Sequence, residues 1–237
     1  MEEEDGEEEI IFDDSLFINR DYELTTFNFG DSVLQLFCLP SASTDYDLTG
    51  QLVWPGAVLL NNYLSENSKL LEGISVIELG SGVGITGILC SRFCKEVVLT
   101  DHNDEVLEIL KQNIKLESSS GNLISSGLSA EKLEWGNCDE MGQILQKYPK
   151  GFDLILGADI CFQQSSVPLL FRTVEVLLRS RAGDCKFILA YVSRAKIMDD
   201  MVINEAVKLG MEVNEVRGTR CIISNLEGVI YEIILPK

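Results

Sequence analysis

The chain has 237 residues, 46% of them apolar, and 38 acidic against 19 basic side chains give it a formal net charge of −19. This length suits one large α/β domain with a sizeable core. The acidity disfavours sequence-independent binding to nucleic acid, because phosphates need a basic face. It suits a basic partner, such as a lysine-bearing protein surface, although it equally serves solubility.

The N-terminus concentrates this charge, since residues 1–9 hold seven acids and no base. We interpret 1–9 as an acidic disordered tail, not a signal peptide. No apolar run reaches the roughly 18 residues of a membrane span, so we expect no membrane association. Seven cysteines without a secretory signal indicate a reducing compartment, cytoplasmic with the nucleus as an alternative. Cys90 and Cys94 are four residues apart, but we expect buried thiols and no metal.

The next segment, 10–47, is expected to be an N-terminal β-hairpin extension. Apolar and polar residues alternate in Thr25–Phe29 and Val33–Phe37, on either side of Gly30-Asp31. A main domain over 48–237 follows. It opens with a helix that begins near Pro55, a residue that suits a first helical turn.

From Ile74 onward the chain alternates between strand and helix patterns. We expect strands at Ile74–Leu79, Glu96–Thr100, Phe152–Gly157 and Lys186–Val192, helices at Ile85–Phe93, from about Asp104, near Val167–Leu178 and near Met198–Leu209, and a loop at Ser118–Ser129. This order predicts a doubly wound parallel sheet. No helix pattern separates Glu212–Val216 from Val229–Leu235, so these strands should pair as an antiparallel hairpin at the sheet edge.

A glycine-rich turn follows the first of these strands, in Val76-Ile77-Glu78-Leu79-Gly80-Ser81-Gly82-Val83-Gly84-Ile85-Thr86-Gly87. Glycines permit a tight turn and let a ligand approach bare backbone. Asp101 ends the next strand at about the offset expected of an acid that binds a ribose. Gly82 to Gly87 also reads as the dinucleotide pattern G-x-G-x-x-G, but it begins two residues after the strand has ended.

The register from the strand is instead Glu78-x-Gly80-x-Gly82-x-Gly84, which resembles motif I of the class I S-adenosylmethionine-dependent methyltransferases. The charge of Glu78 distinguishes the two cofactors. A dinucleotide places its pyrophosphate on the helix N-terminus, where an acid would repel it. S-adenosylmethionine has no phosphate and carries a sulfonium and an ammonium, which an acid favours.

Three further elements extend the resemblance: Thr49-Gly50-x-x-Val53-Trp54-Pro55-Gly56-Ala57, Leu133-Glu134-Trp135-Gly136 and Gly157-Ala158-Asp159-Ile160-Cys161-Phe162. In this order they are similar to the protein-lysine methyltransferases of methyltransferase family 16, over about residues 25–237. The resemblance implies a Rossmann-like, seven-stranded class I sheet with an antiparallel C-terminal strand. It also implies S-adenosylmethionine as cofactor, S-adenosylhomocysteine as product, and no metal.

The family's cofactor residues carry over by position. The resemblance places Trp54 by the methionine part, Asp101 on the ribose and Trp135 by the adenine. The remaining cofactor contacts that it implies are Glu78, Gly80, Ser81, Gly82, Gly84 and Ala158. Either tryptophan could instead be a core residue. His102, next to Asp101, should lie on the adenine side and not act as a general base.

The prediction of the methyl acceptor depends on Asp159 and Phe162, which are the candidate catalytic residues. Methyl transfer needs a neutral amine, whereas a free lysine has a pKa near 10.4. Asp159 either orients the incoming ammonium through charge-assisted hydrogen bonds or supports its loop structurally. Phe162 should wall an apolar lysine channel, and it offers no hydroxyl to the chemistry. Tyr191 is a further channel candidate, or simply a core or rim aromatic.

The predicted function is therefore S-adenosylmethionine-dependent N-methylation of a protein lysine. The family suggests a chaperone or a translation factor as the substrate class, and we expect a monomer. Alternatives are a methyltransferase acting on protein histidine or a small molecule, and a non-catalytic S-adenosylmethionine-binding interaction protein. A nucleic-acid amino-methyltransferase is disfavoured, because Asp159-Ile160-Cys161-Phe162 stands where those enzymes have Asn/Asp-Pro-Pro-Tyr/Phe.

Overall fold

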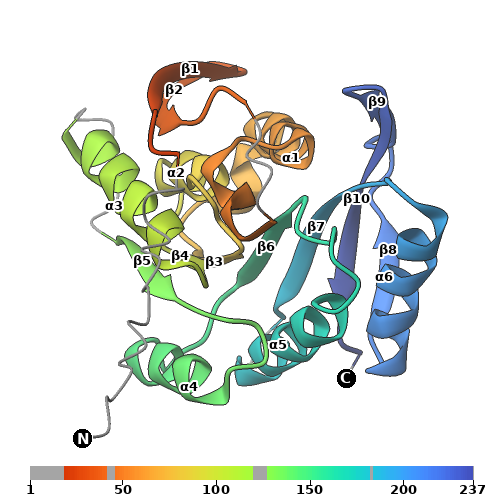
Figure 1. Cartoon of the computed structure of the whole chain (residues 1–237). Helices are drawn as coiled ribbons and strands as arrows, with labels where there is room; N and C mark the ends of the chain where they lie inside the picture. The colour runs from red at the N-terminus through yellow and green to blue at the C-terminus, as the bar shows by residue number, and fades with distance from the viewer. Residues whose placement is uncertain (1–18, 42–45, 120–126, 182–183, 237) are drawn as a thin grey trace, which may run out of the picture.

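Figure 1 shows the computed structural model, which describes residues 19–41, 46–119, 127–181 and 184–236. The acidic tail expected at 1–9 and much of the loop expected at 118–129 lie outside these residues. The main sheet runs in the order β5-β4-β3-β6-β7-β10-β8, with β9 beside β10. Its strands are β3 (Ser75–Leu79), β4 (Glu96–Asp101), β5 (Leu128–Lys132), β6 (Leu154–Ala158), β7 (Lys186–Val192), β8 (Glu212–Glu215), β9 (Cys221–Ile223) and β10 (Leu226–Ile234).

Helices cover both faces of this sheet (Figure 1). They are α1 (Pro55–Glu66), α2 (Ile85–Ser91) and α3 (Asp104–Ser119) on one face, and α4 (Cys138–Lys147), α5 (Val167–Ser180) and α6 (Lys196–Lys208) on the other, with short 3-10 helices η2 (Tyr46–Gln51) and η3 (Ser68–Leu71). Within the described ranges, no helix is long and apolar enough to cross a membrane.

The central strands are apolar on both sides because each face packs against its own helix layer. In β3, Val76 packs with α1, α2 and α3, whereas the next residue, Ile77, packs with α4 and α5. Both side chains are fully buried. Such strands read as continuous apolar runs instead of alternating ones, which is typical of a parallel sheet covered on two faces. The doubly wound parallel sheet predicted from the sequence is confirmed.

The antiparallel edge is also confirmed. β10 pairs antiparallel with β7 on one side and with β8 on the other, where Tyr231 lies opposite Glu215. The short strand β9, which lies between β8 and β10 in the chain, was not predicted. It returns into β10 through Ser224 and Asn225, whose φ angles of 50° and 64° match a two-residue hairpin turn. That turn lacks the glycine that would have marked it in the sequence.

Strand β5 and helix α4 were also not predicted. The loop expected at Ser118–Ser129 is shorter, since α3 continues to Ser119 and β5 begins at Leu128. β5 lies at the sheet edge and is only half-buried, so its sequence carries little apolar signal. Helix α4 does have a recognisable start, because the Asn137 side chain accepts hydrogen bonds from the backbone of Asp139 and Glu140.

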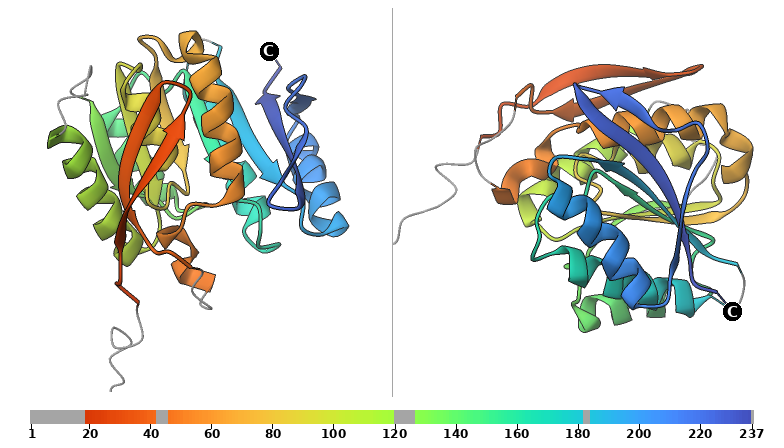
Figure 2. Two further views of the ribbon diagram at one scale, coloured as in Figure 1. Left: turned by 90° about the horizontal axis from the view of Figure 1, so that it is seen from above. Right: turned by 90° about the vertical axis from the view of Figure 1, so that its right-hand side faces the viewer.

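The predicted N-terminal hairpin is present as β1 (Glu23–Phe29) and β2 (Ser32–Cys38). It lies outside the main sheet, across the layer formed by α1, α2 and α3 (Figure 2). Asn113 of α3 fixes it there: its side chain accepts from Phe37 N at 2.8 Å and donates to Phe37 O at 3.0 Å. The same amide nitrogen donates to Val83 O at 2.9 Å, so one buried side chain joins the hairpin to the turn after β3.

Asn113→Ala should therefore destabilise the protein by about 2–3 kcal/mol, because it leaves the partly buried backbone groups of Phe37 and the buried carbonyl of Val83 without this partner. Urea unfolding at neutral pH measures this. Asn62→Ala, at an exposed position of α1, is the control and should change the unfolding free energy by less than about 0.5 kcal/mol. Equal effects of the two substitutions would contradict the role given to Asn113.

Candidate functional site

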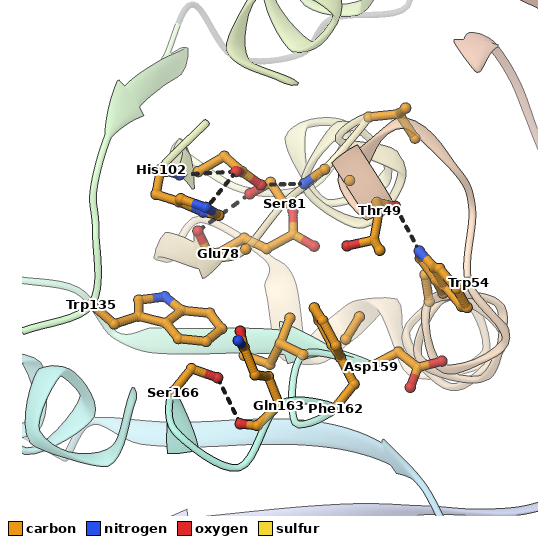
Figure 3. Close-up of a pocket in the computed structure, with 18 of the residues that line it drawn as sticks. Thr49, Trp54, Glu78, Ser81, His102, Trp135, Asp159, Phe162, Gln163 and Ser166 are labelled. Atoms are coloured by element: carbon orange, nitrogen blue, oxygen red, sulfur yellow. Dashed lines mark hydrogen bonds and ion pairs between the residues drawn. The ribbon is translucent and has the colours of Figure 1, made fainter. Parts of the chain in front are cut away.

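A cavity of about 320 Å³ opens at the carboxyl ends of β3, β4 and β6. The sheet order reverses here, since β3 continues to β4 on one side while β6 lies on its other side. Open α/β sheets bind ligands at such switch points. The cavity is lined by every cofactor residue expected from the sequence except Gly84, and by both Asp159 and Phe162. Figure 3 shows residues from distant parts of the chain converging on it.

The turn after β3 forms one wall with bare backbone. Gly80, Gly82 and Gly84 all have positive φ, at 62°, 53° and 88°. A Cβ atom on Gly82 would lie 2.6 Å from the carbonyl oxygen of Gly50, which leaves no room for a side chain. Gly84 precedes α2 and faces Leu110 instead of the cavity, so its role is to shape the turn.

Glu78 lies beneath this turn and is 2% exposed. Its Oε2 accepts a hydrogen bond from Gly87 N at 2.9 Å, across the start of α2. Burial raises the pKa of this carboxyl to about 8, although the bond from Gly87 opposes the rise. A positive charge placed in the cavity would favour the ionised form of Glu78.

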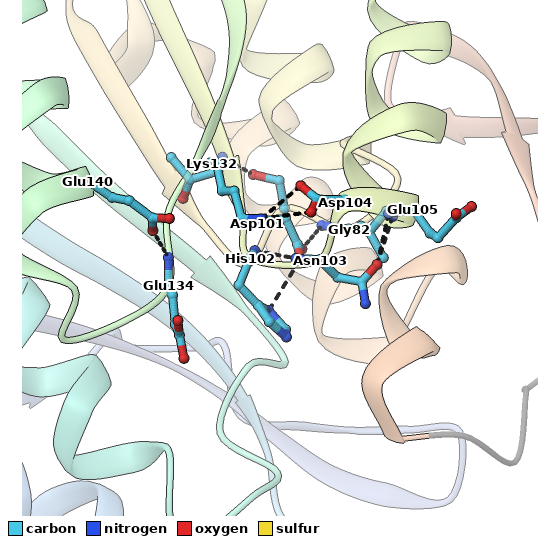
Figure 4. A network of polar contacts seen from close by, with 12 residues as sticks. Gly82, Asp101, His102, Asn103, Asp104, Glu105, Lys132, Glu134 and Glu140 are labelled. Atoms are coloured by element: carbon cyan, nitrogen blue, oxygen red, sulfur yellow. Dashed lines mark hydrogen bonds and ion pairs between the residues drawn. The ribbon is translucent and has the colours of Figure 1, made fainter. Parts of the chain in front are cut away.

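Asp101 is held at the tip of β4 by backbone donors (Figure 4). Its Oδ2 accepts from Gly82 N at 3.1 Å, and its Oδ1 accepts from the backbone of His102 and Asn103. The carboxylate is thereby fixed at the cavity wall as a hydrogen-bond acceptor, which is what ribose hydroxyls require. His102 is at the rim, with its Nδ1 3.4 Å from Asp101 Oδ1.

The two tryptophans lie at opposite ends of the cavity (Figure 3). Trp135 is on the side of His102, and its ring edge would be 3.2 Å from a Cβ on Gly80. It also packs against the core beside α4 and α5, so Trp135 is both a packing residue and part of the cavity wall. Trp54 is on the other side, where its Nε1 donates to Thr49 O at 2.7 Å.

Asp159 directly follows β6 and has a φ of 60°, which is unusual for a residue other than glycine. Its side chain is only 2% exposed and forms a two-pronged ion pair with Arg194, at 2.5 Å for Nη1–Oδ1 and 2.9 Å for Nη2–Oδ2. Gly56 N also donates to Oδ2 at 3.0 Å. Sequence reasoning missed Arg194, which comes 35 residues later in the loop after β7 and belongs to no motif.

Phe162 lies at the same end and is 41% exposed, which suits a wall open to an approaching partner. Tyr191, the further channel candidate, is not among the residues that line the cavity. It is buried in the core between β10 and α6, where its hydroxyl donates to Asp199 at 2.6 Å. The core interpretation of Tyr191 is therefore the correct one.

The charges around the cavity separate the two cofactor interpretations. Four carboxylates line it, Glu78, Asp101, Glu134 and Asp159, and no lysine or arginine does so within the described ranges. None of these four side chains offers a pyrophosphate a positive charge, and Asp101 would repel it. S-adenosylmethionine fits instead, because its positive charges would favour ionisation of Glu78 and Asp101 would accept hydrogen bonds from its ribose.

The raised pKa of Glu78 predicts how stability depends on pH. The native state holds the Glu78 proton up to about pH 8, whereas the unfolded chain releases it near pH 4.3. This contribution to stability is thus complete below the unfolded pKa and is lost as pH rises through the folded one. The loss should approach about 1.4 kcal/mol per pH unit within that window.

Urea unfolding of the wild type and of Glu78→Gln, from pH 5 to pH 8 without ligand, tests this. The difference in unfolding free energy between the two proteins should grow in favour of Glu78→Gln as pH rises. A difference independent of pH would show that Glu78 is ionised in the native state.

Comparison with known proteins agrees with this geometry. Residues 42–205 match the family model described as lysine methyltransferase. The chain is 34% identical over 140 residues to the protein N-lysine methyltransferase METTL21A of Danio rerio, covering 59% of each chain. It is 37% identical over 125 residues to the EEF1A lysine methyltransferase 3 of Xenopus tropicalis, covering 53% of this chain and 51% of that protein. The chain thus spans little more than half the length of these relatives.

A solved structure shares the fold at much lower identity. The magnesium protoporphyrin IX methyltransferase of Synechocystis superposes with a TM-score of 0.56 at 11% identity, covering 83% of this chain and 87% of that one. The architecture is therefore that of the Rossmann-like methyltransferases. Because the family model covers more than half of the sequence, the chain belongs to the lysine methyltransferase family.

Proposed function

We propose that this protein is an S-adenosylmethionine-dependent protein-lysine N-methyltransferase. The observation that carries the proposal is the cavity at the switch point of the sheet, which combines a bare glycine turn with acidic side chains and, among the described residues, no lysine or arginine. Membership of the lysine methyltransferase family supports the same reaction and acceptor.

The chain's own residues would divide the cofactor between them. Asp101 would bind the ribose hydroxyls, and Trp135 would offer a ring face to the adenine. Glu78 would favour the charged methionine part, with Trp54 near it. The rest of the cofactor would lie against backbone, contributed by Gly80, Ser81, Gly82 and Ala158. Gly84 would shape the turn.

When bound, S-adenosylmethionine supplies a methyl group activated by its sulfonium. The protein's part is to align the lysine amine with that methyl group and to keep water out of the line of attack. Phe162 would wall the acceptor end with an apolar ring. Since Phe162 has no hydroxyl, it can contribute packing but neither a proton nor a hydrogen bond.

A protein with an exposed lysine is the proposed acceptor, and a chaperone or a translation factor is the proposed class. Two relatives support a protein lysine as the acceptor: one is a protein N-lysine methyltransferase, and the other is a lysine methyltransferase of EEF1A. A net charge of −19 suits a basic partner. All seven cysteines are free thiols, which is consistent with the reducing, cytoplasmic compartment that we propose. We further propose that the protein is a monomer.

Cofactor choice is tested by calorimetric titration with S-adenosylmethionine and with NAD. Only the former should bind, and Asp101→Ala should weaken it at least tenfold, because the ribose loses its acceptor. Asp104→Ala is the matched control, since Asp104 is 77% exposed, pairs with Lys132 and does not line the cavity. Binding of NAD alone would end the proposal.

The reaction is tested by incubating the protein with a cell extract and S-adenosylmethionine labelled in its methyl group, and then mapping the label by mass spectrometry. We expect label on lysine side chains of one or a few proteins. Label on histidine or on a small molecule would favour the alternative acceptors. Binding of S-adenosylmethionine without any transfer would favour a non-catalytic interaction protein.

A further inference from the structure

The ion pair between Asp159 and Arg194 joins three separate segments at the acceptor end of the cavity. Asp159 follows β6, Arg194 follows β7, and Gly56 N binds the same carboxylate from the start of α1. Asp159 N donates to Ala190 O at 2.9 Å, which pins the positive-φ turn to β7. A Cβ on Gly56 would lie 2.7 Å from Asp159 Cβ, so these segments are in direct contact.

Arg194 is placed precisely enough to set the position of this turn. It is 30% exposed, and its Nη1 also donates to Val192 O at 3.2 Å. Its guanidinium lies over the Trp54 ring, 5.5 Å from the ring centroid. One cation therefore contacts the acid after β6 and the aromatic residue before α1. A planar, permanently charged guanidinium suits such a two-pronged contact better than an ammonium would.

The pair also changes what an incoming lysine would meet. Three hydrogen bonds, two from Arg194 and one from Gly56, occupy most of the acceptor capacity of the Asp159 carboxylate. A free carboxylate at this point would stabilise the lysine as an ammonium, which cannot attack a methyl group. Neutralisation by Arg194 removes that penalty.

We propose that Arg194 is a positioning residue of the acceptor end, which neutralises Asp159 and fixes its turn so that an incoming lysine meets no free anion. This rests on the proposed lysine methylation. Asp159 therefore supports its loop and does not capture the lysine ammonium.

Two other titratable side chains near the pair, Cys161 and Tyr191, stay neutral in the working pH range. Cys161 lies two residues after Asp159, and burial raises the pKa of its thiol above the usual value, with Asp159 adding to the rise. Tyr191, on β7, has its pKa raised by burial and by its hydrogen bond to Asp199. Helix α6 contributes Asp199 and Lys196. Asp199 accepts hydrogen bonds from the hydroxyls of Tyr191 and Ser193, and the Lys196 side chain is exposed.

The experiment measures kcat against pH, from pH 6.5 to 10, on the acceptor protein identified by methyl labelling, at saturating S-adenosylmethionine. The acid limb of such a profile reports the loss of the lysine proton in the complex. Arg194→Met leaves Asp159 as a free anion and should move this limb up by about one pH unit. Asp159→Asn leaves Arg194 unbalanced and should move it down. The double variant should return close to the wild-type limb.

Arg92→Met is the matched control. Arg92 forms a two-pronged pair with Glu117 between α2 and α3, with Nε–Oε1 at 2.8 Å, and it does not line the cavity. Its loss should lower Tm without moving the acid limb. A double-mutant cycle of melting temperatures adds a measurement that needs no turnover. Arg194→Met and Asp159→Asn should each lower Tm by about 5 °C, and the double variant should lower it by clearly less than the sum of the two.

Shifts of the acid limb in opposite directions in the two single variants support the inference. If the pair served only to hold the structure, both variants would lower kcat and the limb would not move in opposite directions. Shifts in the same direction, unshifted limbs, or additive effects on Tm would overturn it while leaving lysine methylation intact. If the wild type transfers no methyl group to lysine, the proposed function fails and the chemical part of the inference fails with it. The double-mutant cycle of melting temperatures then still decides whether the ion pair stabilises the turn at Asp159.

Discussion

The site depends on one constraint, the close packing of the backbone turn after β3. At Gly82 the chain approaches the Gly50 carbonyl so closely that no side chain fits, while Asp101 accepts the hydrogen bond of Gly82 N. Asn113 holds the next residue, Val83, by its carbonyl oxygen. The turn is therefore fixed by η2, by β4 and by α3 together. This explains why a hairpin outside the main sheet matters to the site: the same Asn113 amide that binds β2 also binds the turn.

The cavity has two ends with different electrostatics. At the end near β3 and β4, backbone N–H groups bind Glu78 and Asp101, and neither acid is paired with a lysine or arginine among the described contacts. At the end near β6 and β7, Asp159 is balanced by Arg194. An unbalanced acid attracts a cationic cofactor, whereas a balanced one lets an amine lose its proton. The same residue type thus serves opposite purposes, according to the partner that the fold gives it.

This difference also marks the limit of what the sequence predicts. The strands β3, β6 and β7 and the glycine turn were predictable because burial on two faces leaves continuous apolar runs, and because a positive φ favours glycine. The edge strands β5 and β9 bury little and gave no such signal. Arg194 was beyond reach for another reason. Its partner is 35 residues away, and only the parallel pairing of β6 with β7 brings the ends of those strands together.

The pairing of Asp159 also bears on how the protein would choose its acceptor. With the Asp159 carboxylate occupied by Arg194 and Gly56, the exposed ring of Phe162 is the apolar surface that a lysine side chain would meet at this end. Apolar contact along the four methylenes, worth about 0.8 kcal/mol each, is the same for every lysine and so does not distinguish one lysine from another. Selection of a particular lysine must then come from the surface around it. A chain with twice as many acidic as basic side chains supplies a long-range attraction toward basic partners, while the neutral acceptor end avoids holding the lysine in its unreactive, protonated form.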